Sequence, residues 1–189
     1  MQKMQKIIGL LLILGMAVTA MAIPNIAEAD DDTFTITVTC GFVELTLKLA
    51  DDSAAYTSWP IGTVATSATP AMIGGTGTEA NKCILANVGT SSSAATLSAQ
   101  ITGAATNWTD HATTIGEDVY VLKMDSDPGY TLPATWTDTI VSASDKDLTG
   151  ATAVAAGDDS FLFCKFLAPS STTTGSQQTI TITITITAS

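Results

Sequence analysis

Few side chains in this sequence could do chemistry. The one histidine, His111, follows Asp110, and the three cysteines stand at positions 40, 83 and 164. A histidine can act as a general base, and a thiol as a nucleophile, where a second group activates it. The sequence has no G-x-S-x-G, no H-E-x-x-H and no glycine-rich phosphate loop. We therefore expect no enzymatic activity, and we assign no catalytic and no cofactor-binding residue.

The cysteines are odd in number, which allows at most one disulfide within the chain. Cys40, Cys83 and Cys164 each fall in phase with the apolar side of an alternating segment. No two of them have the C-x-x-C spacing of a zinc site. We expect one disulfide among them or small buried thiols.

Acidic residues recur between the apolar segments. They cluster at 30–32, 51–52, 125 and 127, 145 and 147, and 158–159. Calcium takes several carboxylate and carbonyl oxygens, so weak calcium binding is the metal chemistry that these clusters favour. The run from Asp125 is not an EF-hand loop, because its twelfth position is Trp136. We expect solvated turns here and assign no metal ligand.

Three tryptophans, Trp59, Trp108 and Trp136, stand in segments with the composition of loops. Such aromatic side chains either stack on a sugar ring or cover the edge of a hydrophobic core. We expect the second arrangement, and the first leaves glycan binding as an alternative.

The overall charge excludes several classes of partner. The 189 residues include 18 acids against 7 basic residues, all of them lysines, and the formal net charge is −11. Phosphate backbones and anionic membrane surfaces are bound by clustered basic side chains. We therefore expect no nucleic-acid partner and no attraction to an anionic membrane.

The first residues have the pattern of an export signal. Lys3 and Lys6 precede an apolar run at 7–18, and small-x-small cleavage patterns end at Ala22 and Ala29. We expect a signal peptide over 1–29, cleaved after Ala22 or Ala29, and one domain over 30–189. The domain has no second apolar run long enough to span a membrane. The expected location is extracellular, either secreted or on the cell surface.

Apolar and polar residues alternate with a period of two along most of the domain, which is typical of β-strands with one buried face. Threonine is abundant, and β-branched residues favour strands. We predict an all-β fold, a single antiparallel β-sandwich of jelly-roll or immunoglobulin-like type with about eight or nine strands. The expected strands are 33–40, 43–49, 82–88, 96–102, 119–124, 137–143, 160–167 and 179–187, with weaker candidates at 61–66 and 71–73.

The end of the chain carries a family resemblance. Phe163 and Phe166 precede an Ala-Pro-Ser-Ser turn at 168–171, and a serine- and threonine-rich loop leads to the final Gln-Gln-Thr-Ile-Thr-Ile-Thr-Ile-Thr-Ile-Thr strand at 177–187. This tail, together with the opening strand at 33–40, resembles uncharacterised secreted bacterial β-sandwich proteins. The resemblance implies export and a sandwich fold, and it implies no active site.

The strand at 179–187 is a candidate for assembly. It alternates threonine with Ile180, Ile182, Ile184 and Ile186 and contains no charge, proline or glycine. Such a strand is either paired on both sides inside its sandwich or, at a sheet edge, able to pair with another chain. In the second case we expect this strand, or the one at 33–40, to complete a neighbour's sheet by strand donation, with the isoleucines filling the neighbour's groove.

The function that we expect is therefore that of a non-enzymatic structural subunit, secreted or on the cell surface, which assembles into fibres through a terminal strand. The expected partners are further copies of the chain or other surface proteins. The alternative is an extracellular binding module for calcium, a glycan or a protein partner.

Overall fold

The structure, a computed structural model, describes residues 43–88 and 91–189, all within the unit Cys40–Ser189. These residues contain nine strands and no helix. The predicted signal peptide and the predicted strand at 33–40 lie outside them. No helix with the length and hydropathy to cross a membrane is found in the described ranges.

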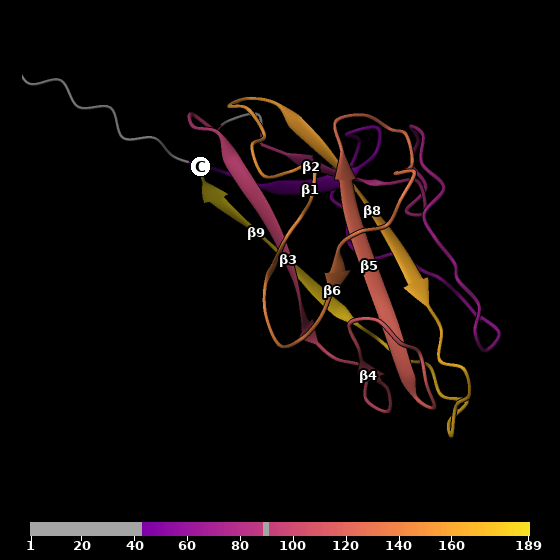
Figure 1. Cartoon of the computed structure of the whole chain (residues 1–189). Helices are drawn as coiled ribbons and strands as arrows, with labels where there is room; N and C mark the ends of the chain where they lie inside the picture. Colours follow the sequence, from indigo (N-terminus) through magenta and orange to yellow (C-terminus); the bar gives the residue numbers. More distant parts are fainter. Residues whose placement is uncertain (1–42, 89–90) are drawn as a thin grey trace, which may run out of the picture. The chain divides into compact units, whose positions relative to one another are not determined.

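Two sheets form the fold, and they pack face to face (Figure 1). The larger sheet has the order β1-β2-β8-β5-β4, and β6 also pairs with β5. The smaller sheet has the order β7-β3-β9. All pairs are antiparallel except the parallel β4–β5 pair. The strands are β1 Thr46–Leu49, β2 Ile84–Asn87, β3 Ala95–Gly103, β4 Thr109–Asp110, β5 Val119–Asp127, β6 Thr139–Ile140, β7 Lys146–Asp147, β8 Asp159–Leu167 and β9 Thr181–Ala188. The predicted β-sandwich is confirmed.

The core lies between the two sheets. Leu122 from β5 and Phe166 from β8, which stand opposite each other, line it from the larger sheet, and Leu97 and Ile101 from β3 line it from the smaller one. All four side chains are buried. Alternation with a period of two places these residues on one face of each strand, which is why the sequence pattern located the long strands well.

The weaker strand predictions were wrong in part. Residues 61–66 form no strand, and at 71–73 a single bridge joins Ala71 to Lys165. The expected strand at 137–143 is reduced to Thr139–Ile140. On either side of it, backbone N–H groups donate to side chains instead of to a strand. The Thr137 N–H donates to the Asp125 carboxylate, and the Ser142 N–H donates to the Asp110 carboxylate. The short strands β4 and β7 were not predicted, since two residues give no periodicity.

A buried carboxylate ties the two sheets together. Asp138, which precedes β6, is 2% exposed, and its carboxylate accepts hydrogen bonds from the N–H and hydroxyl of Thr149. It also forms an ion pair with Lys146 of β7, at 3.2 Å between Asp138 Oδ1 and Lys146 Nζ. Because β6 belongs to the larger sheet and β7 to the smaller one, Asp138 fixes one sheet against the other.

Replacement of Asp138 with alanine is expected to lower the free energy of unfolding by about 1–3 kcal/mol, because the groups that it accepts from lose their partner. The neighbouring exposed Asp147→Ala is the control, with an expected effect within about 0.5 kcal/mol. Urea denaturation followed by tryptophan fluorescence measures both. Equal effects of the two substitutions would contradict the role assigned to Asp138.

Candidate assembly edge

The last strand, β9, lies at an edge of the smaller sheet. It pairs with β3 from Ala95↔Ala188 to Gly103↔Thr181, with a bulge between Ile101 and Gly103. Within the part of the chain that the structure describes, β3 is its only partner strand. The sequence left open whether this strand is paired on one side or on both, and the described residues pair it on one side.

The direction of the β9 backbone groups follows from the hydrogen bonds of β3. The Leu97 N–H donates to the Ala151 carbonyl, and the Leu97 carbonyl accepts from the Leu148 N–H, so both groups of Leu97 point away from β9. In an antiparallel pair, two opposite residues that exchange no hydrogen bonds both direct their backbone N–H and carbonyl groups away from the partner strand. Ile186, opposite Leu97, therefore directs its N–H and carbonyl away from β3.

The same alternation applies along the strand. The Ile101 N–H donates to the Val141 carbonyl, again away from β9, and Ile182 stands opposite Ile101. Ile184 lies between the two in the same phase. The open edge of β9 thus presents the peptide groups of Ile182, Ile184 and Ile186, while the intervening threonines bond to β3.

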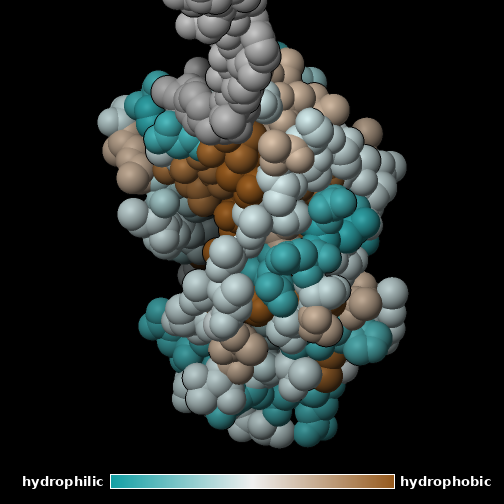
Figure 2. Space-filling model, turned by 90° about the vertical axis from the view of Figure 1, so that its left-hand side faces the viewer, coloured by the Kyte–Doolittle hydropathy of each residue, from teal (hydrophilic) through white to brown (hydrophobic). Residues whose placement is uncertain are grey.

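The isoleucines of β9 pack against the core of their own chain but are incompletely covered. Ile180, Ile182, Ile184 and Ile186 are all partly exposed, whereas the paired residues Leu97 and Ala99 are 0% exposed. Figure 2 shows hydrophobic surface on the side of the molecule where β3 and β9 run in Figure 1. Most of the apolar area of these side chains therefore stabilises their own sandwich, and no described residue covers the remainder.

The other sheet edges are short, charged or covered. The opposite edge of the same sheet, β7, is two residues long and consists of Lys146 and Asp147. The outer side of β1 is covered by the chain that follows it, because the Tyr56 N–H donates to the Leu47 carbonyl and the Leu49 N–H to the Ala54 carbonyl. β4 and β6 have two residues each. Short and charged edges are the devices by which sheets avoid pairing with other chains.

The β9 edge has none of these devices among its own residues. It is eight residues long, and neither β3 nor β9 contains a charged side chain. The uncharged stretch extends from Phe166 to Ser189. In a chain of net charge −11, this is a surface on which a second copy meets little electrostatic repulsion.

Asp110 and His111 are adjacent in sequence, but their side chains bind different partners. The His111 Nδ1 atom accepts hydrogen bonds from the N–H groups of Thr113 and Thr114, at 3.2 and 3.1 Å. The Asp110 carboxylate accepts from the N–H and hydroxyl of Ser142. The His111 ring thus closes a turn, and Asp110 in β4 holds the segment that follows β6.

The acidic clusters prove to be of different kinds. Asp51 and Asp52 are exposed, as expected for solvated turns. The interpretation was wrong for Asp125, which is 3% exposed and accepts from the N–H and hydroxyl of Thr137. No group of three or more histidine, cysteine or acidic residues in the described ranges could hold a metal ion.

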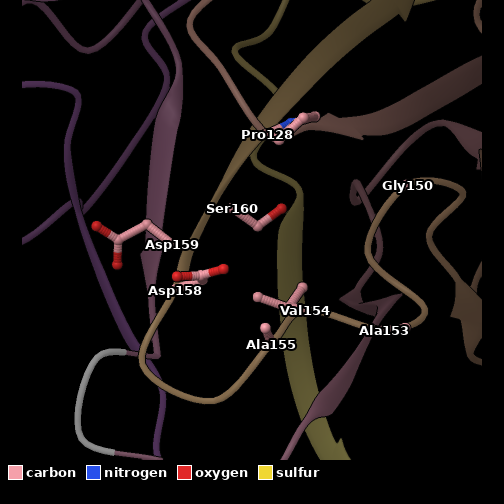
Figure 3. Close-up of a pocket in the computed structure, with 8 residues that line it drawn as sticks. All are labelled: Pro128, Gly150, Ala153, Val154, Ala155, Asp158, Asp159 and Ser160. Carbon is pink, nitrogen blue, oxygen red and sulfur yellow. The ribbon is translucent and has the colours of Figure 1, made fainter.

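A cavity of about 190 Å³ lies beside β8 (Figure 3). Asp158, Asp159 and Ser160 line it, and burial and the neighbouring Asp52 raise the pKa of Asp159. The buried Ser160 hydroxyl has no hydrogen-bond partner among the described residues. Figure 3 shows the Asp159 carboxylate pointing away from Ser160, which leaves Asp158 and one hydroxyl as the side-chain oxygens on the Ser160 side. Calcium takes six to eight oxygens, which is more than these two side chains supply.

The three tryptophans lie at the border of the core. Trp59, Trp108 and Trp136 are partly buried and pack against it. Trp108 stacks on Phe166 with ring centroids 6.2 Å apart, and its indole N–H donates to the Thr172 hydroxyl. They cover the core, as the sequence led us to expect.

The two cysteines in the described ranges are buried free thiols. Cys83 is 0% and Cys164 2% exposed, and they form no disulfide. Cys40 lies outside the described residues. Burial raises the pKa of Cys83 to about 11 and that of Cys164 to about 12, so neither is a ready nucleophile.

Comparison of the chain with protein-family models, with curated proteins and with solved structures finds no match. The function is therefore argued from the geometry of the chain itself.

The buried thiols predict a pH dependence of stability. A cysteine whose pKa is higher in the folded than in the unfolded chain stabilises the fold below the unfolded pKa, near 9, and loses that contribution as the pH rises toward 11–12. We expect the stability difference between the wild type and Cys83→Ala/Cys164→Ala to narrow between pH 9 and 11. Urea denaturation at each pH measures it. A difference that stays constant over this range would contradict burial of the thiols.

Proposed function

We propose that this chain is a non-enzymatic structural subunit, secreted or on the cell surface, which assembles with further copies by adding a β-strand at the β9 edge. The observation that carries the proposal is the contrast among sheet edges. In the described ranges β9 is the one long, uncharged edge, and its outward peptide groups belong to Ile182, Ile184 and Ile186. Repetition of such a contact from copy to copy builds a fibre.

The mechanism is backbone hydrogen bonding combined with the burial of apolar side chains. An added strand would accept from the outward N–H groups of β9 and donate to its carbonyls. Its inward side chains would cover the exposed remainder of the four isoleucines. β9 stays in its own sheet, since leaving it would break the pairing from Thr181 to Ala188.

The binding-module alternative has less support. The cavity beside β8 offers Asp158 and Ser160, fewer oxygens than calcium takes, and the tryptophans that could stack on a sugar ring pack against the core instead.

Two substitutions of Ile184 distinguish the contribution of its outward N–H from that of its side chain. Ile184→Pro removes an outward N–H without touching the bonds to β3, whereas Ile184→Ala removes the side chain and keeps the N–H. For residues 30–189 we expect the alanine variant to assemble and the proline variant to show at least a tenfold loss of assembled material. Sedimentation velocity and electron microscopy measure both.

A charge at the edge gives a second test that does not depend on proline. Thr183→Lys places a charge on the exposed face of β9, and Thr46→Lys places the same change on β1, whose outer side is covered. We expect the first variant to remain monomeric and the second to assemble like the wild type. A wild type that stays monomeric at all concentrations, or edge variants that assemble as it does, would defeat the proposal.

A further inference from the structure

We propose that the strand added to the β9 edge is the segment Thr33–Cys40 of a second copy of the chain. This inference rests on the proposed function, and it names the partner of the same edge. Other strands of the described sandwich are engaged in their own sheets or are two residues long. The segment lies outside the described residues.

The sequence of the segment complements the edge in length and in pattern. Thr33–Cys40 reads Thr-Phe-Thr-Ile-Thr-Val-Thr-Cys, eight residues, and β9 also has eight. Phe34, Ile36 and Val38 alternate with threonine. A strand of this pattern places its apolar residues against the partly exposed isoleucines of β9 and its threonines on the outer face, beside the threonines of β9.

The place where the described chain begins supports this segment as the donor. The Glu44 N–H donates to the Ser91 hydroxyl, and three residues further on the Ala94 carbonyl accepts from the Ser189 N–H, just beyond the end of β9. Cys40 is three residues before Val43, the first described residue. The described chain therefore begins near the end of the molecule where β9 terminates.

The contact between the Thr33–Cys40 segment of one copy and the β9 edge of the next makes the assembly directional. The donor and the acceptor are different parts of the chain, so each copy can give one strand and receive one. Such a contact does not close on itself and extends into a fibre, whereas the pairing of two β9 edges with each other would stop at a dimer.

The distribution of charge favours pairing of the segment with the β9 edge over pairing of the segment with itself. Asp30, Asp31 and Asp32 precede the segment, while β3 and β9 are uncharged. The aspartates keep the segment from stacking with its own kind without repelling the edge that receives it.

The test uses complementation between two full-length mature variants. The donor-blocked variant Ile36→Asp/Val38→Asp has charges at the apolar positions and an intact edge. The edge-blocked variant Ile184→Pro has an intact donor. The matched control Thr35→Asp/Thr37→Asp adds the same charge on the other face of the segment. Light scattering after size exclusion gives the mass of each variant alone and of an equimolar mixture.

We expect each blocked variant to be monomeric alone, the mixture to form heterodimers of twice the monomer mass that grow no further, and the control to assemble like the wild type. If the wild type assembles and the donor-blocked variant does so equally well, the proposed function stands and this inference is wrong, because β9 then pairs with something else. If the wild type assembles but the mixture stays monomeric, donation by this segment is likewise refuted. If the wild type itself stays monomeric, the proposed function fails together with the inference.

Discussion

The need of every backbone N–H and carbonyl for a partner is the constraint on which this structure depends. In a sandwich that need is met inside the sheets and remains at their edges. Here most sheet edges are covered by the chain itself or are only two residues long. The loop after β1 bonds to its outer side, and the edge at β7 is a short lysine–aspartate pair. Among the residues that the structure describes, what remains is the outward row of peptide groups on β9, and the proposed function is a consequence of that row.

Side-chain chemistry in this protein serves the fold. The buried Asp125 carboxylate accepts from Thr137, in the segment between β5 and β6 of the larger sheet, and the buried Asp138 carboxylate accepts from Thr149, in the segment between β7 and β8 that joins the two sheets. The ring of His111 closes a turn, and the thiols of Cys83 and Cys164 are enclosed in the core. In the described ranges these five side chains thus hold loops and strands together or fill the core.

Periodicity predicted the long strands because burial on one face leaves a mark at every second residue. β3, β5, β8 and β9 were located in this way, and the isoleucines of β9 were assigned to the inward face. The same signal could not locate β4 or β7, which have two residues each, or foresee that Asp125 and Asp138 would be buried. Those outcomes depend on tertiary contacts, such as the pairing of Asp147 in β7 with Ser98 in β3 and the Asp138–Lys146 ion pair across the two sheets. The edge position of β9 was likewise open in the sequence, because an alternating strand reads the same at an edge and in the middle of a sheet.

Amide hydrogen exchange along β9 tests the central claim most directly, since the two sides of the strand alternate residue by residue. In dilute monomer the amides of Thr183 and Thr185, which face β3, should be protected, while those of Ile182, Ile184 and Ile186 should exchange quickly. On assembly the isoleucine amides should become protected as well. Slow exchange of those three amides in the monomer, or no change in them when the chain assembles, would contradict an open edge that another copy fills.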